Sequence, residues 1–420
     1  LMLNRATGQI TGRAQATGNF NVVITATNLA GDSLPWVGTL VVQSIPTGAV
    51  GSFQGRVERH AMNSMLGCKI ELTSTPAGLC SGRITLGGLS YAFSSRLDTF
   101  FGLDPELNLT LPRTGLPSIS LNLTLVSSSQ TFSGTVSAGG PAAGVTGWRQ
   151  AWNAVSRPAS DLAGYYSLGL DIQGLDIGNP NVPQGSGFLA CSVGLDGRLA
   201  FVGKLSDGTP VTSSTFLGPT GQTLLYQTLY GHTGSVLGTI SLTPDGSLAF
   251  VDNTFSGTVS WLRKPQPPAT RAYQAGFGPI DLAAYGKYLA ADNRSVILGL
   301  PTPGTAQLMF ASGGVEASAT NPDVNAFTYT SALTVIMPTP GSPLNPGKAT
   351  LSIEKSSGLV GGRFILSDSS GTIIRNIRFE GMVIRPPSGT KKAFGYFMLP
   401  QLPSPTTSPI LSGQIIIDQP

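Results

Sequence analysis

Histidine is the side chain best suited to acid–base or metal chemistry near neutral pH, and this chain of 420 residues has two, His60 and His232. Either kind of chemistry requires a partner group at a suitable spacing, and neither histidine has one in the sequence. Both lie beside turn residues. The motifs GxSxG, HExxH, the phosphate-binding loop and GxGxxG before a helix do not occur. We therefore interpret both as exposed loop histidines, and we predict no enzyme activity and no catalytic, cofactor-binding or metal-binding residue.

The carboxylates offer two pairs that could act together. Asp104 and Glu106 flank Pro105, and Asp171 and Asp176 share a loop. A glycosidase needs two carboxylates roughly 5–10 Å apart in a cleft, a geometry that sequence spacing does not define. Most aspartates here precede glycine or begin turns, so turn formation is the interpretation we favour over catalysis.

Residues Asn321 to Asn325, with the sequence NPDVN, place oxygen-bearing side chains at alternate positions, as calcium loops do. The segment lacks the glycine at position 6 and the distal glutamate of an EF-hand. We favour a plain Asx turn over a calcium site.

The three cysteines, Cys68, Cys80 and Cys191, match no zinc spacing and no CxxC redox motif. Cys68 and Cys80 flank the turn TSTPAG, so a disulfide between them is conceivable. A symmetric hairpin would pair Cys68 with a residue well beyond Cys80, however, and bridged Cα atoms must lie within about 7 Å. We favour buried free thiols and leave the disulfide open.

Aromatic side chains concentrate in the middle of the chain and are candidates for a sugar-binding surface. Core packing uses more aromatics than ligand binding does, so we favour core positions. The residues concerned are Tyr165, Tyr166, Tyr226, Tyr230, Trp261, Tyr273, Tyr285 and Tyr288, together with Trp148 near the first closing strand.

The composition indicates an all-β chain. Only 11% of residues are charged, against roughly 25% in average globular proteins, and Gly (54) and Pro (31) are abundant. Short alternating apolar segments are separated by turn residues, and none approaches the ~18 apolar residues of a transmembrane helix. The net charge of +4 is scattered, with its densest points at Arg263-Lys264 and Lys391-Lys392, so we predict no nucleic-acid partner.

A repeated phrase organises the chain. TFSGTVS occurs at Thr131–Ser137 and again at Thr254–Ser260, and a looser copy, ILSGQII, occurs at Ile410–Ile416. Alternating apolar residues predict a strand that closes a repeated unit, with Phe132, Phe255 and Leu411 buried on equivalent strands.

Matched segments divide the chain into antiparallel β modules, each a sandwich or a barrel. We predict module 1 at 51–152, module 2 at 160–265, and module 3, with an insertion, at 271–420. Asp-Gly pairs such as Asp207-Gly208 indicate hairpins within module 2. One segment, Ile280–Ala291, could form either a twelve-residue helix or a strand and turn.

Residues 1–43 contain Asn4, Thr7-Gly8, Ile10, Gly12, the run GNFNVVITATN from Gly18 to Asn28, and Gly31. This pattern resembles the C-terminal half of the immunoglobulin-like domains of large bacterial surface proteins. The modules that follow resemble, more weakly, β-rich tandem repeat regions of secreted bacterial proteins. The resemblance implies an extracellular or cell-surface location.

A complete sandwich of this type needs about seven strands, and residues 1–43 supply about three. An apolar sheet face without a covering layer is only marginally stable in water. We therefore expect the missing strands to come from residues upstream of Leu1, in a longer secreted protein, or from a neighbouring molecule.

These observations favour an extracellular structural or adhesive protein built from repeated β modules, such as a subunit of a surface assembly or filament. The partners we expect are further copies of the chain or neighbouring domains. The alternative is an array of carbohydrate-binding modules, or the non-catalytic part of a glycan-active enzyme, with a polysaccharide as partner.

Overall fold

The computed structural model describes residues 2–12, 14–99, 103–246, 252–289, 298, 303–330, 334–368, 371–386 and 392–419. Strands dominate this part of the chain, which confirms the all-β class. Its helices are single 3-10 turns, namely η1 (Thr47–Ala49), η2 (Ala61–Asn63), η3 (Gly174–Asp176), η4 (Tyr230–His232) and η6 (Val315–Ala317). Ala290, Ala291 and Lys391, which figured in the predictions, lie outside the described residues.

The chain divides into two compact units. The first comprises Leu1–Val57, Ile70–Thr85 and Ser90–Arg149, and the second comprises Glu58–Lys69, Leu86–Leu89 and Gln150–Pro420.

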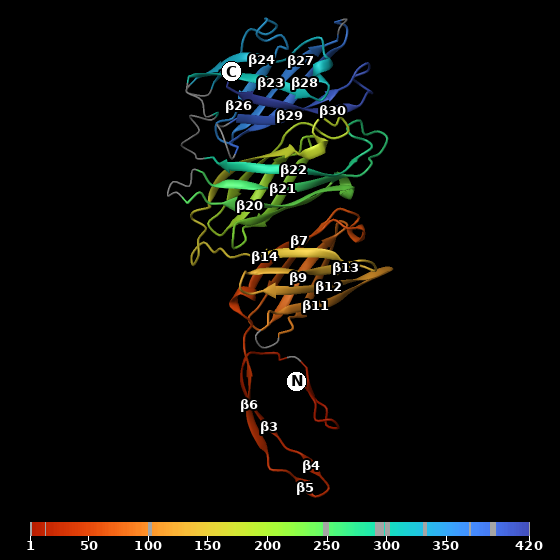
Figure 1. Ribbon diagram of the computed structural model, residues 1–420, viewed down its shortest axis with the longest axis vertical. Coiled ribbons are helices and arrows are strands. Elements are labelled where there is room, and N and C mark those ends of the chain that lie inside the picture. Colours follow the sequence, from red (N-terminus) through yellow and green to blue (C-terminus); the bar gives the residue numbers. More distant parts are fainter. Residues whose placement is uncertain are drawn as a thin grey trace. The chain divides into compact units, whose positions relative to one another are not determined.

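Three eight-stranded antiparallel sheets follow one another along the chain and share one topology. In each sheet the first strand pairs with the last, so the sheet curls into a barrel (Figure 1). The ladder is interrupted once in each barrel, between the fourth and fifth strands of the first two barrels and between the third and fourth strands of the third. Because sequential neighbours pair everywhere except at this interruption, each barrel is an up-and-down meander closed by its terminal strands.

The first barrel is formed by eight strands, β7 (Gly51–Val57), β8 (Cys68–Ser74), β9 (Leu79–Leu86), β10 (Leu89–Arg96), β11 (Glu106–Arg113), β12 (Leu116–Val126), β13 (Thr131–Ser137) and β14 (Ala143–Arg149). Its strands alternate buried and exposed residues, as Cys68, Ile70 and Leu72 of β8 show.

The second barrel is formed by β15 (Gly164–Ile172), β16 (Gly187–Val193), β17 (Arg198–Lys204), β18 (Pro210–Phe216), β19 (Gln222–Leu229), β20 (Gly234–Thr243), β21 (Thr254–Arg263) and β22 (Phe277–Tyr288). The Asp207-Gly208 turn connects β17 to β18, with Gly208 at a φ of 84°. Across the interruption, the side chain of Gln227 accepts a hydrogen bond from the backbone N–H of Thr212 (2.6 Å). A hydrogen bond from the backbone to a side chain thus connects β18 and β19, where the backbone ladder is interrupted.

The third barrel is formed by β23 (Gly304–Ser312), β24 (Val324–Tyr329), β25 (Val335–Ile336), β26 (Thr350–Ile353), β27 (Leu359–Ser367), β28 (Ile374–Ile384), β29 (Lys392–Pro400) and β30 (Ile410–Asp418). Four phenylalanine rings meet at its centre, where Phe310 lies 4.2 Å from Phe364, 5.4 Å from Phe379 and 6.0 Å from Phe397, measured between ring centroids. Aromatic packing therefore fills the interior.

All three copies of the repeated phrase are strands, as predicted, but their equivalence holds for only two. Phe132 on β13 and Phe255 on β21 are buried in the seventh strand of their barrels. Leu411 is only half-buried and lies on β30, the eighth strand of the third barrel. The prediction for Leu411 is therefore wrong, because alternation marks a strand without fixing its place in the meander.

The structure also moves the boundary predicted between modules 2 and 3. Residues 277–288 form β22, which pairs with both β15 and β21 and completes the second barrel. The Pro-rich segment 264–270 is thus a connection inside one barrel. Ile280, Leu282 and Ala284 are buried at every second position, so Ile280 to Tyr288 form a strand, with no helix.

Residues 2–43 form three two-stranded pairs. The strands are β1 (Met2–Leu3), β2 (Ile10–Thr11), β3 (Gly18–Ile24), β4 (Thr27–Asn28), β5 (Gly31–Asp32) and β6 (Trp36–Val42). The longest pair, β3 with β6, is a ladder from Gly18↔Val42 to Ile24↔Trp36. We call β3 and β6 the N-terminal ribbon; it is drawn in red in Figure 1. None of the residues of β3 and β6 is buried.

Candidate functional site

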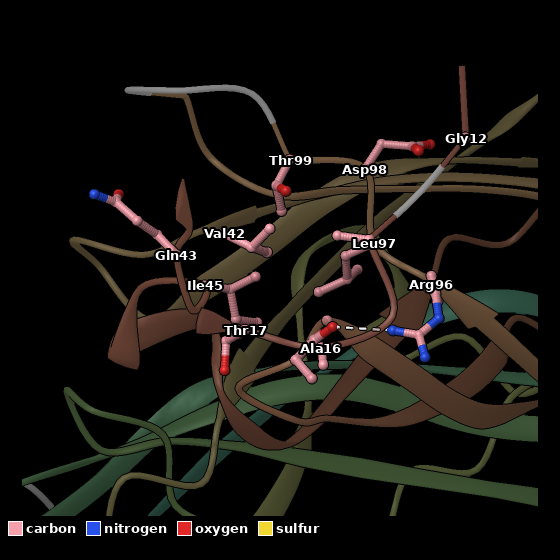
Figure 2. Close-up of a pocket in the computed structure, with 13 residues that line it drawn as sticks. Gly12, Ala16, Thr17, Val42, Gln43, Ile45, Arg96, Leu97, Asp98 and Thr99 are labelled. Atoms are coloured by element: carbon pink, nitrogen blue, oxygen red, sulfur yellow. Dashed lines mark hydrogen bonds between the residues drawn. The ribbon is translucent and has the colours of Figure 1, made fainter. Parts of the chain in front are cut away.

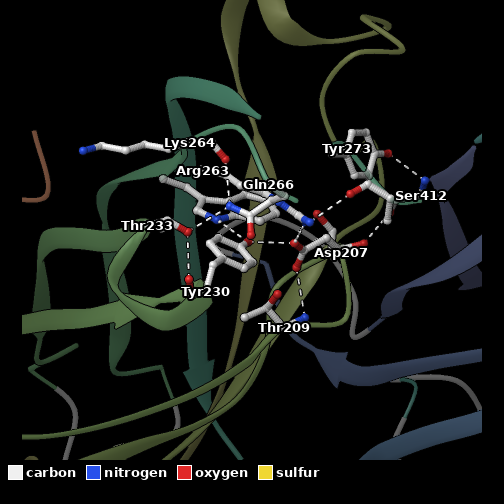
Figure 3. A network of polar contacts seen from close by, with 12 residues as sticks. Asp207, Thr209, Tyr230, Thr233, Arg263, Lys264, Gln266, Tyr273 and Ser412 are labelled. Carbon is white, nitrogen blue, oxygen red and sulfur yellow. Dashed lines mark hydrogen bonds and ion pairs between the residues drawn. The ribbon is translucent and has the colours of Figure 1, made fainter. Parts of the chain in front are cut away.

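A buried ion pair lies at one end of the second barrel (Figure 3). Asp207 follows β17 in a hairpin turn, and Arg263 ends β21. Arg263 Nη1 lies 2.8 Å from Asp207 Oδ2, and the two side chains are 7% and 0% exposed. A charge buried this deeply requires a partner of opposite charge, and Asp207 and Arg263 are partners of each other.

Tyr230 joins this pair to the barrel core. Its hydroxyl donates to Asp207 Oδ2 (2.7 Å) and accepts from Trp261 Nε1 (3.1 Å). The Arg263 guanidinium lies over the Tyr230 ring, 4.5 Å from its centroid. Burial, reinforced by the neighbouring Asp207 carboxylate, raises the pKa of Tyr230 well above its usual value. The phenol therefore stays protonated and acts as a structural donor.

The same end of the second barrel is bonded to the third barrel, within the second unit. The backbone N–H of Ser412, on β30, donates to the Tyr273 hydroxyl (2.7 Å). The Ser412 hydroxyl donates to the carbonyl oxygen of Ser206. Because Ser206 adjoins Asp207, the ion pair and this connection form one polar network, which Figure 3 shows.

Two hollows flank Tyr273. One has a volume of about 380 Å³ and the other about 270 Å³. Pro180, Tyr273 and Leu411 line both, so the hollows meet at the tyrosine. We call them together the Tyr273 cleft. All of its lining residues belong to the second unit.

A further hollow, of about 520 Å³, lies in the first unit (Figure 2). The N-terminal segment contributes Ala16 and Thr17, and the end of β10 contributes Arg96. Arg96 donates to the carbonyl oxygen of Ala77 (3.1 Å) and to Gln15 Oε1 (3.0 Å). The guanidinium thus ties the N-terminal segment to the first barrel and is already engaged.

The two histidines have local roles. His60 precedes η2, and its Nδ1 accepts a hydrogen bond from the backbone N–H of Met62 (3.3 Å). It is half-buried, whereas we expected an exposed side chain. His232 is exposed and adopts a left-handed φ of 70° in η4. Among the described residues, no three His, Cys, Asp or Glu side chains gather as a metal site would require.

The first carboxylate pair has turn and surface roles. Asp104 Oδ1 accepts the backbone N–H of Ser127 (2.8 Å), and Glu106 is exposed on β11. Neither residue borders the hollow of Figure 2.

The second pair is separated by its elements. Asp171 is on β15, whereas Asp176 ends η3. Asp171 Oδ2 accepts from the Tyr285 hydroxyl (2.5 Å), a contact that the sequence predictions missed.

The segment from Asn321 to Asn325 forms the Asx turn we favoured. Asn321 Oδ1 accepts the backbone N–H of Asp323 (2.9 Å). Asp323 Oδ1 accepts the backbone N–H of Phe310 (2.8 Å). Both side-chain oxygens therefore satisfy backbone donors.

Among the aromatic candidates, Tyr166, Trp261 and Trp148 are core residues, at 0%, 0% and 5% exposed. Tyr288 packs its ring 5.5 Å from that of Tyr166. Tyr165, Tyr226 and Tyr285 are partly buried and donate hydrogen bonds through their hydroxyls. Tyr273 is also buried, at 8% exposed, and it borders a cleft.

The cysteines are free and buried. Burial raises the pKa of Cys68 and of Cys80 to about 12, and it also raises that of Cys191. Thiols of this kind remain protonated at neutral pH and pack as small apolar groups.

The sequence predictions missed Arg263 and Asp207 as a pair. From the sequence, Asp207 belongs to an Asp-Gly hairpin, and Arg263 is only part of the basic pair Arg263-Lys264 near the predicted end of module 2. The one available signal was that Arg263 follows the apolar strand residues Trp261 and Leu262 in a chain with few charges.

Two solved structures are similar to this chain at a low level. A DUF3598-family protein of unknown function from Nostoc punctiforme is 12% identical with a TM-score of 0.18, and the match covers 58% of this chain and 97% of that one. Isotype 1 transferrin-binding protein B from serogroup B Neisseria meningitidis is 9% identical with a TM-score of 0.20, covering 95% of this chain and 84% of that one. Similarity this low supports no conclusion about function. The chain matches no protein-family model and no curated protein.

In the part of the chain that the structure describes, no helix has the length and apolar character of a membrane span.

Proposed function

We propose that this chain is a non-enzymatic extracellular or cell-surface protein with a structural or adhesive role, and that it self-associates as part of a surface assembly. The observation that carries the proposal is the N-terminal ribbon, whose apolar side chains are exposed. The low charge and Gly-rich composition support the extracellular location.

The barrels support a structural role because their interiors are filled with side chains. In the second barrel Tyr166, Phe201, Phe255 and Trp261 are all less than 2% exposed. The Tyr166 and Phe255 rings pack edge to face at 5.0 Å. An eight-stranded barrel holds either a packed core or one small ligand, and this one holds a core. Binding to such a protein takes place on its outer surfaces.

The N-terminal ribbon has one strongly apolar face. The ladder pairs Phe20 with Leu40 and Ile24 with Trp36, and side chains of these pairs share a face because their positions differ by even numbers. Phe20, Ile24, Trp36 and Leu40 are 42%, 40%, 58% and 39% exposed. Exposed apolar surface of this kind is typical of an interaction site.

A second copy of the chain is the occupant we propose for this face. Residues 14–43 contain one charged side chain, that of Asp32. Two ribbons can therefore meet face to face with little charge repulsion, and each also has open strand edges that accept further pairing. An oppositely charged partner would find nothing to complement on the ribbon.

The test is the molar mass of the full chain in solution. Light scattering over a concentration series should show reversible self-association, which the double variant Phe20→Ser/Trp36→Ser should lose. The matched control is Asn21→Ser/Thr39→Ser, since these residues form a cross-strand pair on the opposite face. A constant monomer mass for the unaltered chain, or association that survives in the Phe20→Ser/Trp36→Ser variant, would refute the proposal.

A further inference from the structure

The Tyr273 cleft has the dimensions of a ligand site. Its two parts, of about 380 and 270 Å³, meet at Tyr273, Pro180 and Leu411. Small-molecule sites in proteins usually enclose about 300–1,000 Å³. Unlike the filled barrel interiors, this space is open to solvent-borne molecules.

The walls of the cleft provide flat apolar surface. Exposed proline rings supply most of it: Pro180 borders both parts, and Pro268 and Pro409 line the larger part. Tyr273 lies where the two parts meet and is 8% exposed, so only an edge of its side chain reaches the cleft. The C–H face of a sugar ring packs on surfaces of this type, as apolar groups do on aromatic rings and proline rings.

Neutral polar side chains surround these walls and are available for hydrogen bonding. Asn181, Thr270, Gln274 and Thr407 line the larger part, and all are exposed or half-exposed. Within the described residues none of the four side chains makes a hydrogen bond. Amides and hydroxyls both donate and accept, which is the combination that sugar hydroxyls require.

The charged side chains of the cleft are committed to backbone groups. Arg271 donates from Nε to the carbonyl oxygen of Ser408 (2.9 Å) and from Nη2 to that of Pro405 (2.6 Å). Glu316 Oε1 accepts the backbone N–H of Ser312 (2.5 Å). A ligand therefore meets mainly neutral groups, which favours a neutral ligand over an acidic or basic one.

Tyr273 is held rigidly. Its φ of 47° is in the left-handed region, which a bulky residue rarely adopts. Its hydroxyl accepts from the Ser412 backbone N–H (2.7 Å), and its ring packs edge to face on Phe277, with centroids 6.0 Å apart. Residues held in such conformations cluster at binding sites, and a fixed wall loses little entropy when a ligand binds.

We propose that the Tyr273 cleft binds a neutral oligosaccharide. This site goes beyond the proposed self-association and uses no residue of the N-terminal ribbon. If the protein is adhesive, this site defines the class of ligand that it binds. A purely structural role does not require such a site.

The test uses the full chain and a panel of neutral hexasaccharides of glucose, mannose, galactose and xylose, titrated by calorimetry. At least one should bind, and Asn181→Ala/Gln274→Ala should weaken it by about tenfold, as expected for losing two ligand hydrogen bonds. The matched control is Asn108→Ala, which removes an exposed amide from β11, far from the cleft in sequence. It should leave the affinity unchanged.

Three outcomes would overturn the inference: no hexasaccharide binding at millimolar concentration, binding that the Asn181→Ala/Gln274→Ala variant retains, or tighter binding of hexagalacturonate than of any neutral sugar. Unchanged thermal unfolding of the variant shows that its fold is intact, since both side chains are exposed. Molar mass, measured on the same samples, reports self-association separately, so failure of one proposal does not imply failure of the other.

Discussion

Asp171 on β15 and Tyr285 on β22 are diagonal neighbours across the ladder of the second barrel, and their side chains share a hydrogen bond. Burial raises the pKa of Asp171, and the hydrogen bonds from Ser186 and Tyr285 offset only part of that effect. Burial also raises the pKa of Tyr285, with a further contribution from Asp171. Asp171 Oδ2 has a hydrogen-bond partner in Tyr285, whereas the buried Oδ1 has none among the described residues, so the ionised carboxylate is unfavourable at this position.

This pair predicts an unusual pH dependence. Because the pKa of Asp171 is raised on folding, its contribution to stability is complete below the unfolded pKa, about 3.9, and is lost as pH rises through the folded pKa. Asp171→Asn keeps an acceptor for the Tyr285 hydroxyl and removes the charge. We expect the melting temperature of the variant, relative to the unaltered chain, to increase as pH rises above about 4.

Tyr285→Phe is the matched control for this measurement. It removes the hydroxyl that stabilises the carboxylate, so the variant should lose stability more steeply with rising pH than the unaltered chain does. Melting curves of Asp171→Asn that run parallel to those of the unaltered chain at every pH would contradict the argument.

Residue pairs of this kind could not be predicted from the sequence. Asp207 and Arg263 are 56 positions apart, and Asp171 and Tyr285 are 114 apart. Only the meander brings their strands together. The Asx turn at Asn321 could be predicted, because its donors and acceptors are a few residues apart.

At the scale of strands, the three barrels share a cross-strand pair that is not apparent from the alignment of the repeated phrase. A seventh-strand phenylalanine lies opposite an eighth-strand glycine in each barrel. The pairs are Phe132↔Gly147, Phe255↔Gly286 and Phe397↔Gly413. In the first and third barrels the phenylalanine ring lies over the glycine and occupies the space of its missing side chain.

This phenylalanine–glycine pair explains why the prediction for Leu411 was wrong. ILSGQII matches TFSGTVS in its letters, yet Gly413 is the counterpart of Gly147 and lies on the eighth strand. The eighth strand of the second barrel, β22, follows a Pro-rich connection that resembles a linker. Strand positions follow from alternation, whereas strand order depends on pairing, which local sequence does not encode.

Gly413→Ala should destabilise the third barrel. A methyl group at this position would lie 2.1 Å from the Phe397 ring, far inside van der Waals contact. Overpacking of this type costs about 1–3 kcal/mol. Denaturant unfolding should show this loss, and adding Phe397→Leu should recover part of it.

Gly361→Ala is the matched control, in β27 of the same barrel. A methyl group there would approach no atom closer than 3.9 Å, so stability should change little. Equal losses for Gly361→Ala and Gly413→Ala would show that strand glycines matter through their backbone freedom and would contradict the role of the Phe397 ring.

At the scale of the molecule, the second and third barrels share an interface inside the second unit. Phe188, Met382, Ile384 and Tyr396 form a separate apolar cluster there, and the Phe188 and Tyr396 rings stack with centroids 6.3 Å apart. Beside the cluster, Lys204 Nζ lies 2.5 Å from Glu380 Oε2.

Hydrogen bonds extend this interface away from the apolar cluster. The backbone N–H of Ser186 donates to the carbonyl oxygen of Gly395 (3.0 Å), and Gln414 Nε2 donates to the Ser186 hydroxyl (2.8 Å). Together with the contacts of Ser412, these hydrogen bonds connect the second and third barrels at several points of the interface. Apolar packing together with satisfied polar contacts is characteristic of a permanent interface.

The interface predicts that the second and third barrels lose stability together. Ile384 on β28 is 0% exposed, so Ile384→Asp buries an unpaired charge in the cluster, at a cost of about 3 kcal/mol or a partial opening of the interface. Amide hydrogen exchange should then accelerate in β16 of the second barrel as well as in β28 and β29 of the third. Ile374, on the same strand, is 65% exposed, so Ile374→Asp should leave both barrels unchanged. Acceleration confined to the third barrel would mean that the barrels are stable independently and that the shared cluster contributes little.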